Sequence, residues 1–112
     1  CDIDRIQKSL DRFGERFEQR VFTEIERAKA ARRPFTKAGT LAKRFAAKEA
    51  LYKALSPEHG LQWHDAEVIN LPNGKPAFLF RGQIADLVDG ASVHLSLSHD
   101  AGIASAMVVI ER

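Results

Sequence analysis

Residues Arg44-Phe-Ala-Ala-Lys-Glu-Ala-Leu-Tyr-Lys-Ala-Leu55 form an uninterrupted run of helix-favouring residues near the middle of the chain. The run contains no Gly, Pro or Asn, so it predicts a stable helix. With 3.6 residues per turn, Phe45, Glu49 and Lys53 share one face. We expect this face to present one carboxylate and one ammonium, while the helix packs closely through a second stripe of small and apolar residues. The members of that stripe are Ala47, Ala50, Leu51 and Ala54.

Glu49 and Lys53 are four residues apart, which is the spacing of a common surface ion pair on a helix. Such a pair stabilises an isolated helix by about 0.2–0.5 kcal/mol and requires no function. From helical periodicity alone, we therefore favour a solvated ion pair over a catalytic site at this face.

The composition is typical of one small globular domain. The chain has 112 residues, of which 45% are apolar and 29% are charged, so it can bury a modest core. No apolar run is long enough to span a membrane, and no secretory signal is visible. The only cysteine, Cys1, cannot form an internal disulfide, which is consistent with a cytoplasmic protein. Because the chain opens on Cys1 rather than on Met, we expect its natural start to lie upstream.

Positive charge is concentrated in the first half of the chain, although the net charge is only +2. Residues 1–53 contain most of the Lys and Arg residues. A basic half favours an acidic protein partner or a phosphorylated ligand. A small nucleic-acid-binding domain is an alternative, but the predicted strands do not alternate aromatic with basic residues, as a nucleic-acid platform would.

Cap and turn signals divide the chain into helices followed by strands. Thr23-Glu-Ile-Glu26 has the spacing of a capping box at a helix start, and Pro34 interrupts the helical pattern. Asn73-Gly74 between two apolar runs predicts a hairpin turn. The predicted helices cover 2–13, 15–21, 23–31, 37–55 and 83–88. The predicted strands cover 66–71, 77–80, 92–98 and 103–110, with 99–102 as a turn. This order predicts a single α+β domain over residues 1–112, with helices packed on a small antiparallel sheet.

Several motifs occur in the order and spacing of a known family. Phe45-Ala-Ala-Lys-Glu-Ala50 precedes Lys53-Ala54, Asn73-Gly-Lys-Pro76 lies at the hairpin, and His94-Leu-Ser-Leu-Ser-His99 lies in a late strand. Together with Asp4-Arg-Ile6 in the first helix, this set resembles the 4′-phosphopantetheinyl transferases, in particular their short bacterial type. The resemblance implies their α+β fold. It also implies transfer of the 4′-phosphopantetheine arm from coenzyme A to a serine of an acyl carrier protein for fatty-acid synthesis, with adenosine 3′,5′-bisphosphate released.

The resemblance also assigns active-site residues. It implies that Glu49 is a ligand of Mg²⁺, an ion that takes one or two carboxylates together with substrate phosphates. Lys53 would stabilise charge on the coenzyme A phosphates, so Glu49 and Lys53 are the predicted catalytic pair. His99 is predicted to contact coenzyme A, with a local turn bond as the alternative. Lys48 is either a second phosphate contact or a solvated side chain.

Two features depart from the family pattern. The family's second metal carboxylate, an Asp in a Gly-x-Asp-Ile segment, falls upstream of Cys1 in this register, as does the first strand. Asp2 and Asp4 lie at helix positions and do not replace it. The segment Ser56-Pro-Glu-His-Gly60 is shorter than the Gly-rich loop of the family, so we assign no cofactor contact there. A catalytically impaired paralogue that keeps carrier docking therefore stays an alternative.

Arginines near the start of the chain indicate a carrier protein as the partner. Four residues match positions that the family uses to dock acidic acyl carrier proteins: Arg5, Arg16, Phe17 and Arg20. Arginine suits this role because its planar fork binds a carboxylate through two hydrogen bonds, although a charge stripe is more often only a solvated face. The short members of the family are homotrimers with active sites shared between neighbours, which implies the same assembly here, without a membrane or nucleic-acid partner.

Overall fold

The computed structural model describes residues 1–32, 37–56 and 62–112, in which helices precede strands as predicted. The first helices are α1 (Ile3–Phe13), α2 (Glu15–Val21), α3 (Glu24–Ala31) and α4 (Lys37–Leu55). A short 3-10 helix, η2 (Trp63–Asp65), leads into β1 (Ala66–Asn70) and β2 (Pro76–Phe80). The remaining elements are α5 (Gly82–Leu87), β3 (Ser92–Asp100) and β4 (Ile103–Glu111).

Local signals set the boundaries of the first three helices. The Asp2 side chain accepts a hydrogen bond from the Asp4 amide and caps α1. Gly14 ends that helix with φ of +57°, a conformation that glycine adopts without strain. Thr23 caps α3 and forms the predicted capping box with Glu26. The predicted boundaries of α2 and α4 are confirmed.

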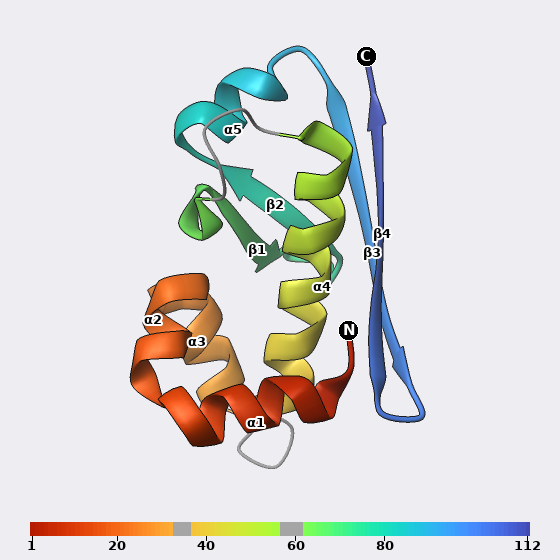
Figure 1. Ribbon diagram of the computed structural model, residues 1–112. Helices are drawn as coiled ribbons and strands as arrows, with labels where there is room; N and C mark the ends of the chain where they lie inside the picture. Colours follow the sequence, from red (N-terminus) through yellow and green to blue (C-terminus); the bar gives the residue numbers. More distant parts are fainter. Residues whose placement is uncertain (33–36, 57–61) are drawn as a thin grey trace.

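Helix α4 is the axis of the molecule, as Figure 1 shows. Helices α1–α3 pack around its first half, the β1–β2 pair lies on one side, and the long β3–β4 pair lies on the other. Ala47 and Leu51 of the predicted alanine stripe are fully buried, but Ala50 is half-buried and Ala54 is exposed. The core consists of one cluster around Phe22 and Leu41 and a second around Leu51, Tyr52 and Ile84. Trp63 packs against both clusters and joins them.

The strands form two separate antiparallel pairs rather than the single small sheet that we predicted. In the β3–β4 pair, Val93, Leu95 and Leu97 point inward and alternate with exposed residues, as predicted. Strand β3 continues through His99 to Asp100, beyond the predicted turn, because His99 pairs with Ala104. The turn is confined to Ala101 and Gly102, which both have positive φ.

The start of the chain lies along the free edge of β4. The Cys1 amine donates to the Ala104 carbonyl at 2.6 Å, and the Ala104 amide donates to the Cys1 carbonyl at 2.7 Å. The Ile3 amide donates to the Gly102 carbonyl at 2.9 Å. These bonds fix the beginning of α1 beside the hairpin tip. In the part of the chain that the structure describes, no helix is long and apolar enough to cross a membrane.

Candidate active site

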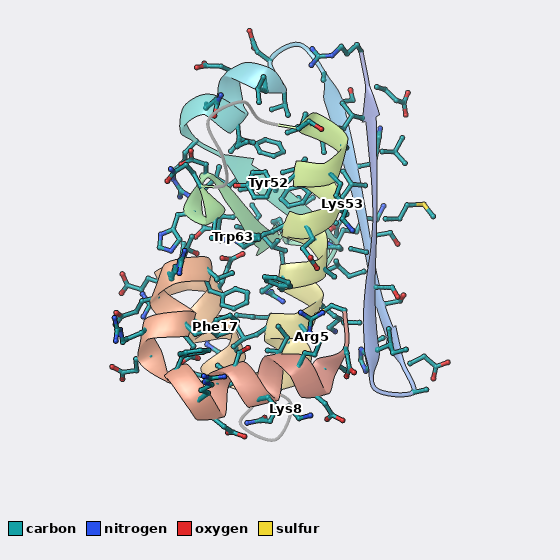
Figure 2. The ribbon with its side chains drawn as sticks, viewed as in Figure 1. Arg5, Lys8, Phe17, Tyr52, Lys53 and Trp63 are labelled. Atoms are coloured by element: carbon teal, nitrogen blue, oxygen red, sulfur yellow. The ribbon has the colours of Figure 1, made fainter. Side chains whose placement is uncertain are left out.

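Glu49 and Lys53 lie on the same face of α4, as the helical period predicted. Glu49 is half-buried, and Lys53 is exposed in the last turn of the helix, where Figure 2 labels it. Within residues 1–32, 37–56 and 62–112, no ion pair joins Glu49 to Lys53 or to another cation. The interpretation of a solvated i,i+4 ion pair is therefore wrong. A carboxylate and an ammonium stand one turn apart, and neither neutralises the other.

Lys48 has a different environment from the one we predicted. Its side chain is fully buried, and its Nζ atom lies 2.9 Å from Oε1 of Glu26, whose side chain is also fully buried. The same ammonium donates to the carbonyls of Trp63, at 2.7 Å, and Ala66, at 2.9 Å. All three of its donors are occupied, so the prediction of a phosphate contact is wrong, as is that of a solvated side chain. Burial lowers the pKa of Lys48, against the opposing attraction of Glu26.

A second buried carboxylate extends this network across β1. Glu67 is 2% exposed and accepts hydrogen bonds from the Thr23 hydroxyl and from the Arg81 guanidinium, the latter at 3.1 Å. The Glu26 carboxylate accepts from the Thr23 amide at 2.9 Å and from the Val68 amide at 2.8 Å. The carboxylates of Glu26 and Glu67 are thus hydrogen-bonded inside the molecule, which is the condition for burying them.

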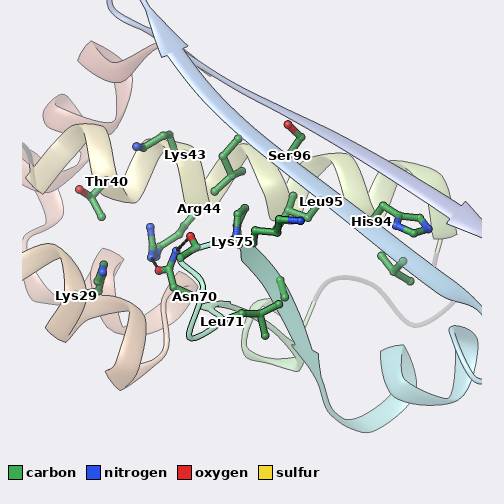
Figure 3. A pocket seen from close by; sticks show the side chains of 15 residues that line it. Lys29, Thr40, Lys43, Arg44, Asn70, Leu71, Lys75, His94, Leu95 and Ser96 are labelled. Carbon is green, nitrogen blue, oxygen red and sulfur yellow. Dashed lines mark hydrogen bonds between the residues drawn. The ribbon is translucent and has the colours of Figure 1, made fainter.

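A basic pocket of about 910 Å³ opens on the opposite side of α4. Figure 3 shows it between α4, β3 and the turn of the β1–β2 hairpin. Four cationic residues line it: Lys29, Lys43, Arg44 and Lys75. Counting 100° per residue, its α4 residues lie roughly 180° around the helix from Glu49. In one chain, therefore, the Glu49–Lys53 face and the basic pocket are separated by the helix itself.

Asn70 connects two walls of the basic pocket. Its side-chain oxygen accepts from Arg44 at 3.1 Å, and its side-chain nitrogen donates to the Gly74 carbonyl at 3.3 Å. The helix and the hairpin turn are thereby tied together at the pocket. Our reading of the sequence did not assign Lys29, Asn70 or Lys75 to a site. The Asn73-Gly-Lys-Pro76 motif could have pointed to Lys75, but we interpreted that motif only as a turn.

The structure does not bring His99 to the Glu49–Lys53 face of the same chain. His99 is exposed near the end of β3 and pairs with Ala104, which clusters with Ala42 near the start of α4. From Ala42 to Lys53 the helix rises roughly 17 Å. His94, on the same strand, is exposed on the outer face, with Nε2 3.1 Å from Oε1 of Glu111.

The predicted docking residues lie on α1 and α2. Arg5, Arg16 and Arg20 are exposed, whereas Phe17 is half-buried and packs against the first core cluster. Its ring meets Phe22 edge-on, with centroids 6.0 Å apart. Figure 2 labels Arg5 and Phe17 on these two helices. The three arginines are thus exposed side chains of α1 and α2, and the phenylalanine anchors α2 to the core.

The carboxylate of Glu49 is the type of group that binds a hard cation. Mg²⁺ commonly takes one or two protein carboxylates and completes its shell with water and substrate phosphates. In the described residues, no three side chains of His, Cys, Asp or Glu converge on a common point. Glu49 by itself offers such an ion one carboxylate. The loop segment Ser56–Gly60 falls largely on residues 57–61, which lie outside the described residues.

Comparison with known proteins identifies the family. The sequence profile of the 4′-phosphopantetheinyl transferase superfamily matches residues 1–105. The chain belongs to this superfamily. The transferase is 52% identical to the holo-[acyl-carrier-protein] synthase of Sphingopyxis alaskensis, over 99% of this chain and 90% of that protein. It is 56% identical to the holo-[acyl-carrier-protein] synthase of Erythrobacter litoralis, again over 99% of this chain and 90% of that protein.

A solved structure shares the fold of the transferase. The Helicobacter pylori holo-[acyl-carrier-protein] synthase, crystallised in complex with coenzyme A, superposes with a TM-score of 0.85 at 30% identity. The match covers 99% of this chain and 95% of that one. The family and the α+β fold that the motifs predicted are thereby confirmed.

Proposed function

We propose that this transferase moves the 4′-phosphopantetheine arm from coenzyme A to a serine of an acyl carrier protein, with help from Mg²⁺. The observation that carries the proposal is the Glu49–Lys53 face of α4, where an acid and a base stand one turn apart without pairing. The relatives named holo-[acyl-carrier-protein] synthase, and the coenzyme A complex of the Helicobacter pylori enzyme, support the same substrates.

Glu49 and Lys53 would act on the pyrophosphate of coenzyme A. When the arm is transferred, negative charge grows on the departing phosphate oxygens, so cationic groups that meet them lower the barrier. A bound Mg²⁺ would supply most of that charge, with Glu49 as one of its ligands. Lys53 is exposed on the same side of the helix, so its ammonium group can approach a phosphate.

The basic pocket is the natural place for the nucleotide end of coenzyme A. Its four cationic residues balance the negative charge of a bisphosphate nucleotide. Because α4 separates the pocket from Glu49, one coenzyme A can contact both only if a second copy of the chain contributes one of them. His99 would meet the coenzyme in the same shared arrangement.

A homotrimer with active sites shared between neighbours agrees with this separation. The outer face of the β3–β4 pair exposes apolar side chains that a lone chain leaves in water. Ile103 is 53% exposed, Met107 is 67% exposed and Val109 is 43% exposed. Burying such a patch against other copies is the usual route by which small domains complete a core. We also propose a cytoplasmic location, which suits a chain with one cysteine.

The acyl carrier protein would dock on the exposed arginines of α1 and α2. Arg5, Arg16 and Arg20 offer forked donors to the carboxylates of an acidic helical partner. A nucleic-acid partner has less support, because the exposed arginines are not interleaved with stacking aromatic residues.

The proposal is tested by mass spectrometry of an apo-acyl carrier protein after incubation with coenzyme A and Mg²⁺. The Glu49→Ala variant should lower turnover at least about a hundredfold through lost charge stabilisation. Glu24→Ala is the matched control, because Glu24 is an exposed glutamate on another helix, and it should leave turnover unchanged. Transfer by Glu49→Ala at the wild-type rate would contradict the assigned site, and the absence of transfer by the natural full-length chain would contradict the function.

A further inference from the structure

The buried Glu26–Lys48 ion pair joins three elements of the fold at one point. Glu26 belongs to α3 and Lys48 to α4, and their charged atoms lie 2.9 Å apart with both side chains fully buried. The second carboxylate oxygen of Glu26 accepts the Val68 amide of β1 at 2.8 Å. Lys48 also donates to the carbonyl of Ala66, the first residue of that strand. One pair of charges therefore ties α3, α4 and β1 together.

The same three elements form a wall of the basic pocket, close to these ties. Lys29 lies three residues after Glu26, Arg44 lies four residues before Lys48, and Asn70 lies two residues after Val68. Lys29 and Arg44 lie about one helical turn from the tie on their own helices, so each lies on the same side of its helix as the tie. Asn70 follows two residues after the Val68 amide that Glu26 holds. Lys29, Arg44 and Asn70 also line a smaller adjoining cavity of about 450 Å³.

Stability alone does not account for the pair. Removing two charges from water costs about as much as their attraction returns, and buried ion pairs replaced by apolar residues often leave stability unchanged or raised. Apolar side chains, however, allow packed helices to slide, whereas the three donors of an ammonium fix directions and distances. The pair therefore selects one spacing of α3, α4 and β1.

We propose that Glu26 and Lys48 are positioning residues for the binding of coenzyme A. The ion pair between them holds Lys29, Arg44 and Asn70 at the spacing that the phosphates of the substrate require. The inference rests on the proposed function. Neither residue touches the substrate, because both side chains are fully buried. Their effect is on the affinity for the nucleotide, while the docking of the carrier protein on α1 and α2 stays as it is.

The double variant E26Q/K48M tests this, since it removes both charges and leaves no lone buried charge. It should raise the KM for coenzyme A at least about tenfold, with kcat and the KM for the carrier protein within about threefold of wild type. Calorimetry should show the dissociation constant of adenosine 3′,5′-bisphosphate rising in parallel. The melting temperature should stay close to that of wild type.

The matched control is E67Q/R81M, which removes the other buried carboxylate and its arginine partner, at 3.1 Å. Glu67 also belongs to β1, but neither Glu67 nor Arg81 lines the pocket. A general loosening of the fold would affect coenzyme A binding in both double variants. An unchanged KM for coenzyme A in E26Q/K48M, or an equal rise in the control, overturns the inference.

Glu26→Asp decides the matter should E26Q/K48M fail to fold. It keeps both charges but shortens the carboxylate by one methylene, so it should shift the walls and raise the KM for coenzyme A by a smaller factor. An unchanged value in that variant overturns the inference while wild-type transfer leaves the proposed function standing. A wild-type protein that neither binds coenzyme A nor modifies the carrier overturns both.

Discussion

Lys48 and Glu49 are adjacent in the chain, yet the fold uses them for opposite purposes. A step of one residue turns the helix by about 100°, so Lys48 points into the interior while Glu49 lies on a different face of the helix. The first is fully buried with its donors occupied, and the second is half-buried without an ion pair in the described residues. Lys48 thus serves the packing of the fold, whereas Glu49 is the residue that we propose for the chemistry.

Tyr52 provides a prediction at the scale of one residue. Its side chain is 4% exposed, its hydroxyl donates to the Gln62 carbonyl, and its ring meets Trp63 edge-on. Burial raises the pKa of Tyr52 well above its ordinary value. The folded state therefore keeps the Tyr52 hydroxyl protonated above the unfolded-state pKa of about 10. The contribution of Tyr52 to stability is complete below that pH and is lost as the pH rises further.

Denaturant unfolding at a series of pH values from 8 to 11 tests this, with Tyr52→Phe as the reference that cancels the titration of the lysines. Above about pH 10, the free energy of unfolding of wild type should fall by up to about 1.4 kcal/mol per pH unit more than that of the variant. The chain has one tyrosine, so the absorbance of tyrosinate reports on Tyr52 alone. A midpoint near pH 10 in the folded protein would contradict the prediction.

At the scale of elements, α1 and α2 form a separate surface from the faces of α4. Figure 1 shows them at the end of the molecule opposite the C-terminus. Their exposed arginines are therefore expected to govern the encounter with the carrier protein and not the binding of coenzyme A. The basic pocket contains no residue of α1 or α2.

Reversing the charge of Arg16 and Arg20 to Glu should raise the KM for the carrier protein and leave the KM for coenzyme A nearly unchanged. The loss should lie mostly in the association rate, and added salt should reduce it, since exposed charges are screened over about 8 Å at physiological ionic strength. Stopped-flow association and steady-state kinetics measure both. Arg112→Glu, at the far end of the molecule, should have no effect on the carrier. An equal rise in the KM for the carrier protein from that control would contradict the assignment of Arg16 and Arg20 to the docking surface.

At the scale of the whole molecule, the exposed apolar face of β3 and β4 is where we propose that copies of the chain meet. Met107→Glu places a charge at the most exposed of its large apolar side chains. If copies of the chain meet on this face, the variant should dissociate to monomers, as measured by analytical ultracentrifugation, and should lose transfer activity with the shared site.

Leu79→Glu is the control for this assembly, because Leu79 is an exposed apolar residue on β2, in the other strand pair. It should leave the oligomer and its activity intact. A monomeric wild type that is fully active, or a Met107→Glu variant that still assembles, would refute the shared site.

The sequence by itself determined the order of elements, most of their ends and the family. These follow from signals between near neighbours: the capping box of Thr23 and Glu26, the Asn73-Gly74 turn, the alternation along β3 and the motif around Glu49. Periodicity also placed Glu49 and Lys53 on one face, because the helical angle depends only on residue spacing.

Only the tertiary structure decided what each charged side chain of α4 faces. Whether Lys48 meets water or Glu26 depends on α3 and β1, which contact α4 from distant parts of the chain. The basic pocket likewise combines Lys29 of α3, Arg44 of α4 and Lys75 of the β1–β2 turn. Local periodicity fixes the direction of a side chain about its own helix, but the partner it meets there is set by long-range packing.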